Sequence, residues 1–545
     1  MLFAALLASA VAAPDAAAFG QACMALQGRT FGDLVVTGAR EIPAGPAPAP
    51  ALMSPNGGPP AARPGLPEHC LATADIARRT GADGQPYAIK IELRVPADWN
   101  GRFLYQGGGG MNGVVMTALG EPTPSGDREP PALARGFAVV STDSGHQAAN
   151  PADSRFAKDQ QAKLDYGYAA IGKVTAGAKL LIGELTGRAP TKSYFMGCSN
   201  GGREALIAAQ RYPTEFDGII SANPAFELSH AAILSTYSAN VFAAAAAKRQ
   251  TDASRLLTPA DGALLQSAIL AQCDALDGAK DGMVFNRACR FDIRKIVCKG
   301  KAADGCLAPD KAEAIETAFR GPRDRDGKAV VGSWSYDASQ FSQGWRIWQT
   351  GTPTPNGGAF TLLRDLVSNS LSDYFAFPAI KRPVKTDDVP SLLKAVAATA
   401  AITDADSTDF RTFEARGGKL ILVTGWSDPI FSAPQLAAWY ERMSSDMQDA
   451  TGRAGADFAR LFVVPGMEHC GGGAALDDFD PLSALVAWTD GQAGPALFVA
   501  KGQAFPNVTR PICAYPASAR YDGTGPVQDA ASFRCEVPKP DTKAS

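Results

Sequence analysis

A serine flanked by glycines, placed between a predicted strand and a predicted helix, constrains the fold of this chain more than any other feature. The apolar residues 193–196 are followed at once by the sequence GCSNG at residues 197–201, and a helical pattern runs through residues 202–212. Glycines at these places permit a sharp backbone turn and close packing of the helix against the strand. A strand, a tight turn and a helix in this order indicate a sheet that presents Ser199 at its edge.

Short apolar segments recur on both sides of this motif, with stretches of helical periodicity between them. Residues 88–95 alternate apolar with charged side chains, as a strand with one solvent-facing side does, whereas the other segments are mostly apolar. We therefore expect an α/β fold, with a largely parallel sheet covered by helices on both faces. The expected strands are residues 88–95, 103–106, 137–141, 193–196, 218–221, 419–424 and 461–464.

The middle of the chain has a different character. Residues 226–418 are loop-rich, contain four of the ten cysteines and carry a cluster of tryptophans. We expect this stretch to be a lid domain inserted between strands of the sheet. Residues 14–225 and 419–545 are then expected to form the catalytic domain together.

The N-terminus and the cysteine count bear on the compartment. Residues 1–13 are apolar and end near an A-x-A sequence, which predicts a signal peptide, although no Lys or Arg precedes the apolar run. An ordinary apolar helix is the alternative. Ten cysteines, an even number, suggest up to five disulfides in a secreted or periplasmic protein. No other segment reads as a membrane span.

Charge and histidine content exclude several functions. Lys plus Arg is 52 and Asp plus Glu is 55, a net charge of −3, so a nucleic-acid partner or an anionic membrane surface is not expected. Only four histidines occur, which argues against a metal centre built from several of them. Any histidine that moves a proton must come from this small set.

Two segments supply partners for Ser199. Asp428 follows the expected strand at residues 419–424, and His469 follows the one at 461–464. The order serine, acid, histidine, with each residue just past a strand, is that of an α/β-hydrolase triad. Asp406 and Asp409 are rival acids, but they precede the strand.

A glycine run predicts how the site would hold an oxyanion. Residues 107–110 are four glycines that directly follow the expected strand 103–106. Such a run lets backbone N–H groups approach a substrate oxygen, so we expect donors from Gly109 and from Asn200, the residue after the serine. A flexible surface loop is the alternative. A phosphate-binding loop is disfavoured, because no Lys-Ser/Thr pair follows the glycines.

These motifs resemble the tannase and feruloyl esterase family, which also takes in hydrolases of terephthalate monoesters. The sequences GCSNGGRE at residues 197–204 and GMEHCGGG at residues 466–473 carry the likeness, and it spans the chain from about Cys23 to Cys535. The family joins the cysteine before the serine to the one after the histidine, here Cys198 and Cys470. A thiol nucleophile at Cys198 is the rival interpretation, but that position of the motif points away from substrate.

The resemblance also implies the remaining disulfides, since sequence alone leaves their connectivity open. The implied pairs are Cys23–Cys70, Cys273–Cys289, Cys298–Cys306 and Cys513–Cys535.

An acidic loop at residues 273–283 is a candidate calcium site. Its three carboxylates are hard oxygen ligands of the kind Ca²⁺ prefers, although their spacing is not that of an EF-hand. The resemblance implies a structural calcium in the lid. A solvated acidic turn is the alternative. The implied ligands are the side chains of Asp274, Asp277 and Asp281 and the backbone carbonyls of Ala279 and Met283.

Taken together, the motifs and the resemblance imply a secreted serine carboxylic ester hydrolase that acts on small-molecule esters of feruloyl, galloyl or terephthaloyl type. Trp345, Arg364 and Phe431 are the candidate substrate contacts. Arg364 would pair with a substrate carboxylate, and an exposed surface arginine is the alternative. Two alternatives stay open: a calcium-stabilised secreted binding protein with a degenerate site, and a serine peptidase. The oligomeric state does not follow from the sequence.

Overall fold

A ten-stranded mixed sheet carries the candidate site. In the computed structural model, which describes residues 16–48, 64–121, 129–149, 153–300, 305–324, 326–354 and 359–538, the predicted signal peptide lies outside the described residues. The strand order is β1 (Thr30–Phe31), β2 (Leu34–Ile42), β5 (His69–Thr80), β6 (Pro86–Pro96), β8 (Ala138–Thr142), β7 (Arg102–Gln106), β9 (Lys192–Cys198), β10 (Gly218–Ala222), β13 (Lys419–Gly425) and β14 (Ala459–Val464).

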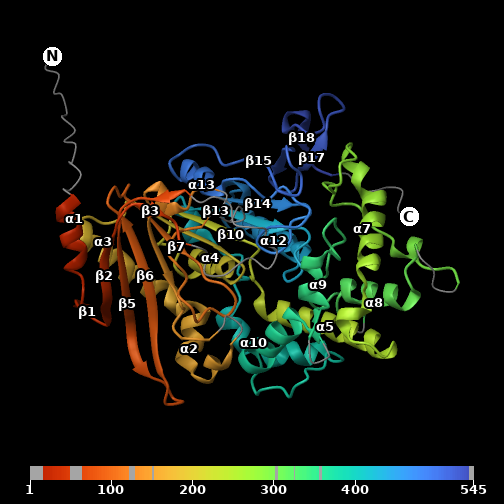
Figure 1. Ribbon diagram of the computed structural model, residues 1–545, viewed down its shortest axis with the longest axis horizontal. Coiled ribbons are helices and arrows are strands. Elements are labelled where there is room, and N and C mark those ends of the chain that lie inside the picture. Colours follow the sequence, from red (N-terminus) through yellow and green to blue (C-terminus); the bar gives the residue numbers. More distant parts are fainter. Residues whose placement is uncertain are drawn as a thin grey trace.

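The α/β prediction is confirmed, and the parallel prediction needs one correction. The strands β8, β7, β9, β10, β13 and β14 run parallel to one another, and each matches a segment that the sequence predicts. The strands β1, β2, β5 and β6 are antiparallel to their neighbours. Short turns join β1 to β2 and β5 to β6, and a short turn can connect only antiparallel strands. Figure 1 shows these N-terminal strands at one end of the molecule.

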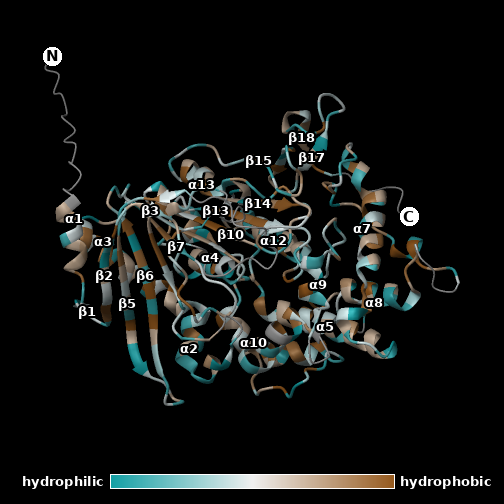
Figure 2. Cartoon of the chain, viewed as in Figure 1, coloured by the Kyte–Doolittle hydropathy of each residue, from teal (hydrophilic) through white to brown (hydrophobic). Residues whose placement is uncertain are grey.

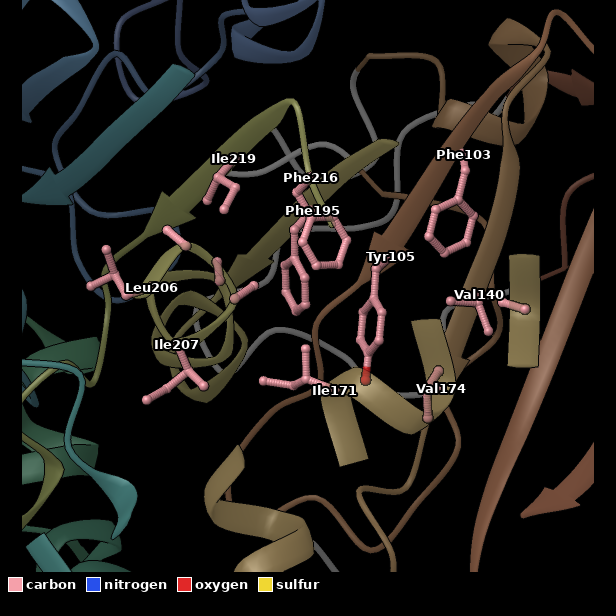
Figure 3. Close-up of a cluster of buried hydrophobic side chains, with 14 of the residues drawn as sticks. Phe103, Tyr105, Val140, Ile171, Val174, Phe195, Leu206, Ile207, Phe216 and Ile219 are labelled. Atoms are coloured by element: carbon pink, nitrogen blue, oxygen red, sulfur yellow. The ribbon is translucent and has the colours of Figure 1, made fainter. Parts of the chain in front are cut away.

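Helices cover both faces of the sheet because its strands alternate their side chains. Phe103 and Tyr105 of β7 point into one hydrophobic cluster and Leu104 into another. The helices α3 (Ala170–Thr186), α4 (Asn200–Arg211) and α12 (Ala433–Thr451) pack on the first face, where Figure 3 shows Tyr105 beside Phe195. The helix α13 (Pro481–Thr489) packs on the second face. Figure 2 shows hydrophobic residues along the strands and a hydrophilic end to the β5–β6 hairpin.

The chain between β10 and β13 contributes no strand to the main sheet in its described part. Most of a second hydrophobic cluster comes from this segment, and the rest of that cluster, including Tyr87, Phe156 and Tyr166, comes from before β9. Figure 1 shows the helices of the segment, in green and teal, gathered beyond the sheet. Its main helices are α5 (Leu228–Lys248), α6 (Ala253–Leu256), α7 (Pro259–Cys273), α8 (Pro309–Arg320), α9 (Gln343–Gln349), α10 (Val389–Thr403) and α11 (Arg411–Ala415). It also contains the short pair β11 (Thr352–Pro353) and β12 (Ala359–Phe360).

Small elements and disulfides complete the fold. Outside the regions above lie α1 (Ala16–Met24), α2 (Gln160–Leu164) and the short strand pairs β3 (Gly45–Pro46) with β4 (Gly65–Leu66), β15 (Leu497–Ala500) with β16 (Arg510–Cys513), and β17 (Ser518–Tyr521) with β18 (Phe533–Glu536). The structure pairs the ten cysteines as Cys23–Cys70, Cys198–Cys470, Cys273–Cys289, Cys298–Cys306 and Cys513–Cys535, the pairs that the resemblance implies. Within the described ranges, none of the helices combines the length and the apolar character that a bilayer span requires.

Candidate active site

Five chain segments meet at one edge of the sheet. The strands β7, β9, β10, β13 and β14 are parallel and adjacent in that order, so their carboxyl ends lie along the same edge. Each end leads directly into a segment with polar or glycine residues. These are the glycine run 107–110, Ser199, Asn223, Asp428 and His469. In open sheets with parallel strands, this edge is where ligands bind.

Ser199 sits on a strained turn between β9 and α4. Its φ is 63° and its ψ is −124°, a conformation that non-glycine residues rarely adopt. A Cβ on Gly197 would lie 2.6 Å from the backbone of Gly201, and a Cβ on Gly201 would lie 2.6 Å from the carbonyl oxygen of Gly108. The two glycines therefore permit close approaches of α4 to the strand and to the glycine run. Ser199 is half-buried and occupies the N-cap position of α4. The turn therefore has the form that the GCSNG sequence predicts.

Asp428 and His469 are hydrogen-bonded in the geometry of a catalytic pair. The Nδ1 atom of His469 lies 2.9 Å from Oδ2 of Asp428, and the same oxygen accepts a bond of 2.8 Å from Nδ2 of Asn223. The other carboxylate oxygen accepts from the backbone N–H groups of Ile430 and Phe431 at 2.8 and 3.1 Å. This arrangement fixes the proton of the imidazole on Nδ1 and leaves Nε2 to act as a base.

The structure separates the rival acids from this pair. Asp409 forms an ion pair with Arg411 at the surface, and that side-chain hydrogen bond lowers the pKa of Asp409 to about 2. Asp406 is exposed as well. Asn223, by contrast, contacts Asp428 and is absent from the sequence prediction. Its place just after the predicted strand 218–221 is a sequence signal that points to it, and the structure holds it there at a positive φ of 37°.

A disulfide links the serine turn to the histidine loop. Cys198 precedes Ser199 and Cys470 follows His469, and the two cysteines are bonded with their Cα atoms 6.0 Å apart. The two segments are 272 residues apart in sequence. A covalent bond between their neighbours restricts the distance between Ser199 and His469 to a narrow range.

Removing this disulfide is expected to lower activity beyond its effect on stability. Replacing Cys198 and Cys470 together with serine should reduce kcat about 10-fold or more, because small displacements of reacting groups are costly. The matched control replaces Cys513 and Cys535 with serine, which removes a disulfide in the C-terminal region. Both variants are assayed well below their melting temperatures. Equal losses of kcat in the two variants would show that the Cys198–Cys470 disulfide contributes only to stability.

The glycine run is held by a buried polar network. The N–H of Gly108 donates to Oε2 of Glu204 at 2.9 Å, and Nδ2 of Asn112 donates to Oε1 of the same carboxylate at 2.6 Å. Nδ2 of Asn200 also donates to this Oε1, at 3.1 Å. Gly109 itself is exposed at the tip of the loop. Because these bonds anchor the loop, they do not support the alternative of a flexible surface loop. The sequence does not predict this role of Glu204.

Two aromatic rings border His469. The centroid of the Phe431 ring lies 5.3 Å from the imidazole centroid, and that of Trp348 lies 5.8 Å away, both edge-on. Trp345 is different: it is fully buried, and its ring packs against Phe242 and Phe341 within the inserted segment. The expected substrate contact at Trp345 is therefore corrected, because Trp348, three residues further on, is the tryptophan beside the histidine.

Arg364 is exposed and lies at the start of a π-helix, Leu363–Ser368, in the inserted segment. Its predicted contact with a substrate carboxylate stays a prediction.

Comparison with known proteins now assigns the chain to a family. Residues 73–536 match the profile of the family described as tannase and feruloyl esterase. The chain belongs to this family. It is 38% identical over 522 residues to mono(2-hydroxyethyl) terephthalate hydrolase from Piscinibacter sakaiensis, covering 87% of this chain and 85% of that protein. It is 27% identical over 478 residues to a probable feruloyl esterase B from Aspergillus clavatus, covering 82% and 83%.

Solved structures confirm the fold of this tannase and feruloyl esterase family member. The crystal structure of feruloyl esterase B from Aspergillus oryzae superposes with a TM-score of 0.77 at 23% identity, covering 95% of this chain and all of that one. Tannin acyl hydrolase from Aspergillus niger gives a TM-score of 0.70 at 19% identity, covering 95% and 94%. The family is one of carboxylic ester hydrolases, which favours this class over a binding protein or a peptidase.

The acidic loop offers the right chemistry for calcium without a formed cage. Asp274 and Asp277 are buried, and burial raises the pKa of Asp277 to about 7, with the charges of Asp281 and Asp274 adding to the effect. A divalent cation would relieve this repulsion. The carboxylates currently accept backbone N–H groups of their own loop, including that of Ala279, and Asp281 pairs with Arg510. No group of three or more acidic, His or Cys side chains in the described chain converges as metal ligands would. Met283, the last residue of the loop, is buried.

Proposed function

We propose that this member of the tannase and feruloyl esterase family hydrolyses esters of aromatic acids through a Ser199–His469–Asp428 triad. The observation that carries the proposal is the bond of 2.9 Å between Asp428 and His469, in a loop that a disulfide ties to the turn bearing Ser199. The positions of these residues after the parallel strands β9, β13 and β14 support the same assignment.

The proposed reaction has two halves. His469 takes the proton of Ser199 through Nε2 as the serine oxygen attacks the ester carbonyl, and Asp428 stabilises the imidazolium that results. The backbone N–H groups of Gly109 and Asn200 are proposed to bind the oxyanion. His469 then donates its proton to the leaving alcohol, which leaves an acyl-enzyme. Water, activated by the same histidine, releases the acid and restores the serine.

The aromatic surroundings of His469 support an aromatic substrate. The rings of Phe431 and Trp348 lie beside the base, and an aromatic acid would pack against them favourably. The relatives named as feruloyl esterase and as terephthalate monoester hydrolase point to the same class of acid. Arg364 is proposed to pair with a distal carboxylate where the substrate has one.

A panel of esters tests this proposal. Methyl ferulate, methyl gallate and mono(2-hydroxyethyl) terephthalate are supplied at equal concentration, with methyl cyclohexanecarboxylate as a saturated control of similar size. We expect kcat/KM for at least one aromatic ester to exceed the control by about 10-fold or more, a difference of about 1.4 kcal/mol in transition-state binding. Equal turnover of the control, or turnover of casein alone, would contradict an aromatic ester hydrolase.

We further propose that residues 226–418 form a lid domain over the sheet edge and that the protein is secreted or periplasmic. The hydrophobic cluster that this segment mainly forms supports the first proposal. The five disulfides support the second, since disulfides persist in oxidising compartments. Recovery of the protein in the cytoplasmic fraction alone would contradict the second.

Calcium in the acidic loop is proposed as a structural ion with no part in the chemistry. Asp274, Asp277 and Asp281, with the carbonyls of Ala279 and Met283, would hold it. Chelation with EGTA is expected to lower the melting temperature by roughly 5 °C, because a ligand bound only by the folded state stabilises it. Added Ca²⁺ should restore the value and Mg²⁺ should not. An unchanged melting temperature, or an equal response in Asp277→Asn, would refute a calcium site here.

A further inference from the structure

One stretch of the inserted segment contacts both loops that carry the catalytic acid and base. We name residues 335–349 the brace, residues 426–431 the acid loop and residues 466–474 the histidine loop. Ser335 donates from Oγ to the carbonyl of Trp426, and Nε2 of Gln349 donates to the carbonyl of Pro429 at 2.6 Å. The brace is thus bonded to the acid loop on both sides of Asp428.

The centre of the brace is Asp337, a fully buried carboxylate. Its Oδ2 atom accepts a bond of 2.8 Å from the hydroxyl of Ser427 and one of 2.6 Å from the backbone N–H of Gly466. Ser427 immediately precedes Asp428, and Gly466 lies three residues before His469. One oxygen atom therefore joins the acid loop to the histidine loop.

Ser339, also in the brace, forms a second link between the acid loop and the histidine loop. Its backbone N–H donates to the hydroxyl oxygen of Ser427 at 3.2 Å, and its Oγ accepts from the N–H of Ala474 at 2.6 Å. Since Ser427 uses its hydroxyl proton for Asp337 and its oxygen for Ser339, its rotamer is fixed at both ends. His469 lies between two points that the brace holds, Gly466 and Ala474.

The backbone at Gly466 explains why an acceptor is needed there. Its φ is 70°, and a Cβ at this position would lie 1.9 Å from the carbonyl oxygen of Ala474, so the turn excludes any side chain. The N–H of such a buried turn needs a partner, because an unpaired buried amide costs about 1–3 kcal/mol. Asp337 supplies that partner from another part of the chain. Burial raises the pKa of Asp337 to about 6, so its place in the interior is itself unfavourable.

We propose that Asp337 is a positioning residue, which sets the distance and orientation of His469 relative to Asp428 by joining their loops through Oδ2. The inference rests on the proposed triad. It gives the inserted segment a part in holding the catalytic geometry, in addition to its proposed place over the site. The backbone N–H of Ser427 donates to the carbonyl of Met467 at 3.1 Å and brings the two loops together. Asp337 then fixes how the two loops are oriented relative to each other.

The experiment compares three variants with matched chemistry. Asp337→Ala removes the shared acceptor, whereas Asp337→Asn keeps one oxygen that can accept both bonds. Asp404→Ala is the control, because Asp404 is also a buried carboxylate that accepts from one backbone N–H and one hydroxyl, both of Ser229. For each variant we measure the melting temperature, kcat and KM for whichever aromatic ester of the panel is hydrolysed best, and the rate at which a fluorophosphonate labels Ser199.

Asp337→Ala is expected to lower kcat and the labelling rate about 10- to 100-fold with KM changed less than about 2-fold, because the base and its acid lose their alignment. Asp337→Asn should recover most of both rates, and Asp404→Ala should lose stability with kcat close to wild type. Equal kcat losses in Asp337→Ala and Asp404→Ala, or an Asp337→Asn as impaired as Asp337→Ala, would overturn the proposal. Labelling that survives Ser199→Ala would instead defeat the proposed function, so the two failures are distinguishable.

Discussion

Replacing Ser199 with alanine is expected to lower kcat for an aromatic ester by about 10,000- to 1,000,000-fold, since the oxyanion donors and the binding surface alone provide only a small residual rate. The change removes one oxygen atom from a residue whose backbone conformation is fixed by the turn between β9 and α4. The melting temperature should stay close to that of the wild type. Turnover of methyl ferulate or of mono(2-hydroxyethyl) terephthalate, whichever is the better substrate, provides the measurement.

The control for this variant is Ser483→Ala. Ser483 is an exposed serine at the start of α13, where it bonds to the capping Asp480. Its removal should leave kcat within about 2-fold of wild type, as surface substitutions away from a site do. A Ser199→Ala enzyme with more than about a hundredth of wild-type kcat would show that another group acts as nucleophile.

Replacing Asp428 with asparagine is expected to lower kcat about 10,000-fold. Both oxygens of Asp428 accept bonds, one from Asn223 and His469 and the other from the backbone N–H groups of Ile430 and Phe431. An amide has only one acceptor oxygen, so its NH₂ group must face donors. If it faces His469, the imidazole adopts the tautomer with its proton on Nε2, and that nitrogen can no longer accept the proton of Ser199.

Asp409→Asn is the matched control for this substitution. Asp409 is the rival acid from the sequence, and it is exposed and paired with Arg411. Its replacement should change kcat less than about 2-fold, because a surface ion pair contributes little. If Asp409→Asn lost more activity than Asp428→Asn, the assignment of the catalytic acid would be wrong.

Much of the sheet and of the candidate site could be predicted from the sequence, because the informative residues lie next to regular elements. Ser199, Asp428 and His469 each follow an apolar segment, so strand prediction places them together. The antiparallel strands β2 and β5 are not among the strands that the sequence predicts. Their residues mix small, polar and charged types, as in the stretch HCLATADIARRT of β5, and show no clear period.

The supporting residues could not be predicted, because their roles depend on contacts between distant segments. Asp337 lies about 90 residues from Ser427 and 129 from Gly466, and nothing in its local sequence indicates either partner. In the sequence, Glu204 is a charged residue of a predicted helix. Its bond to the glycine run becomes visible only in the folded structure. The tryptophans of α9 show the same limit: Trp345 and Trp348 are three residues apart, and only the packing of the helix decides which ring faces His469.

The most direct test of the proposed triad is the site of covalent labelling by a fluorophosphonate. The protein is treated with the probe, digested and mapped by mass spectrometry, alongside Ser199→Ala and His469→Ala. We expect stoichiometric modification on the peptide that contains Ser199, no modification in Ser199→Ala, and a strongly reduced rate in His469→Ala. An unmodified protein, or a label on any other residue, would contradict the account of Ser199 as a nucleophile activated by His469 and Asp428.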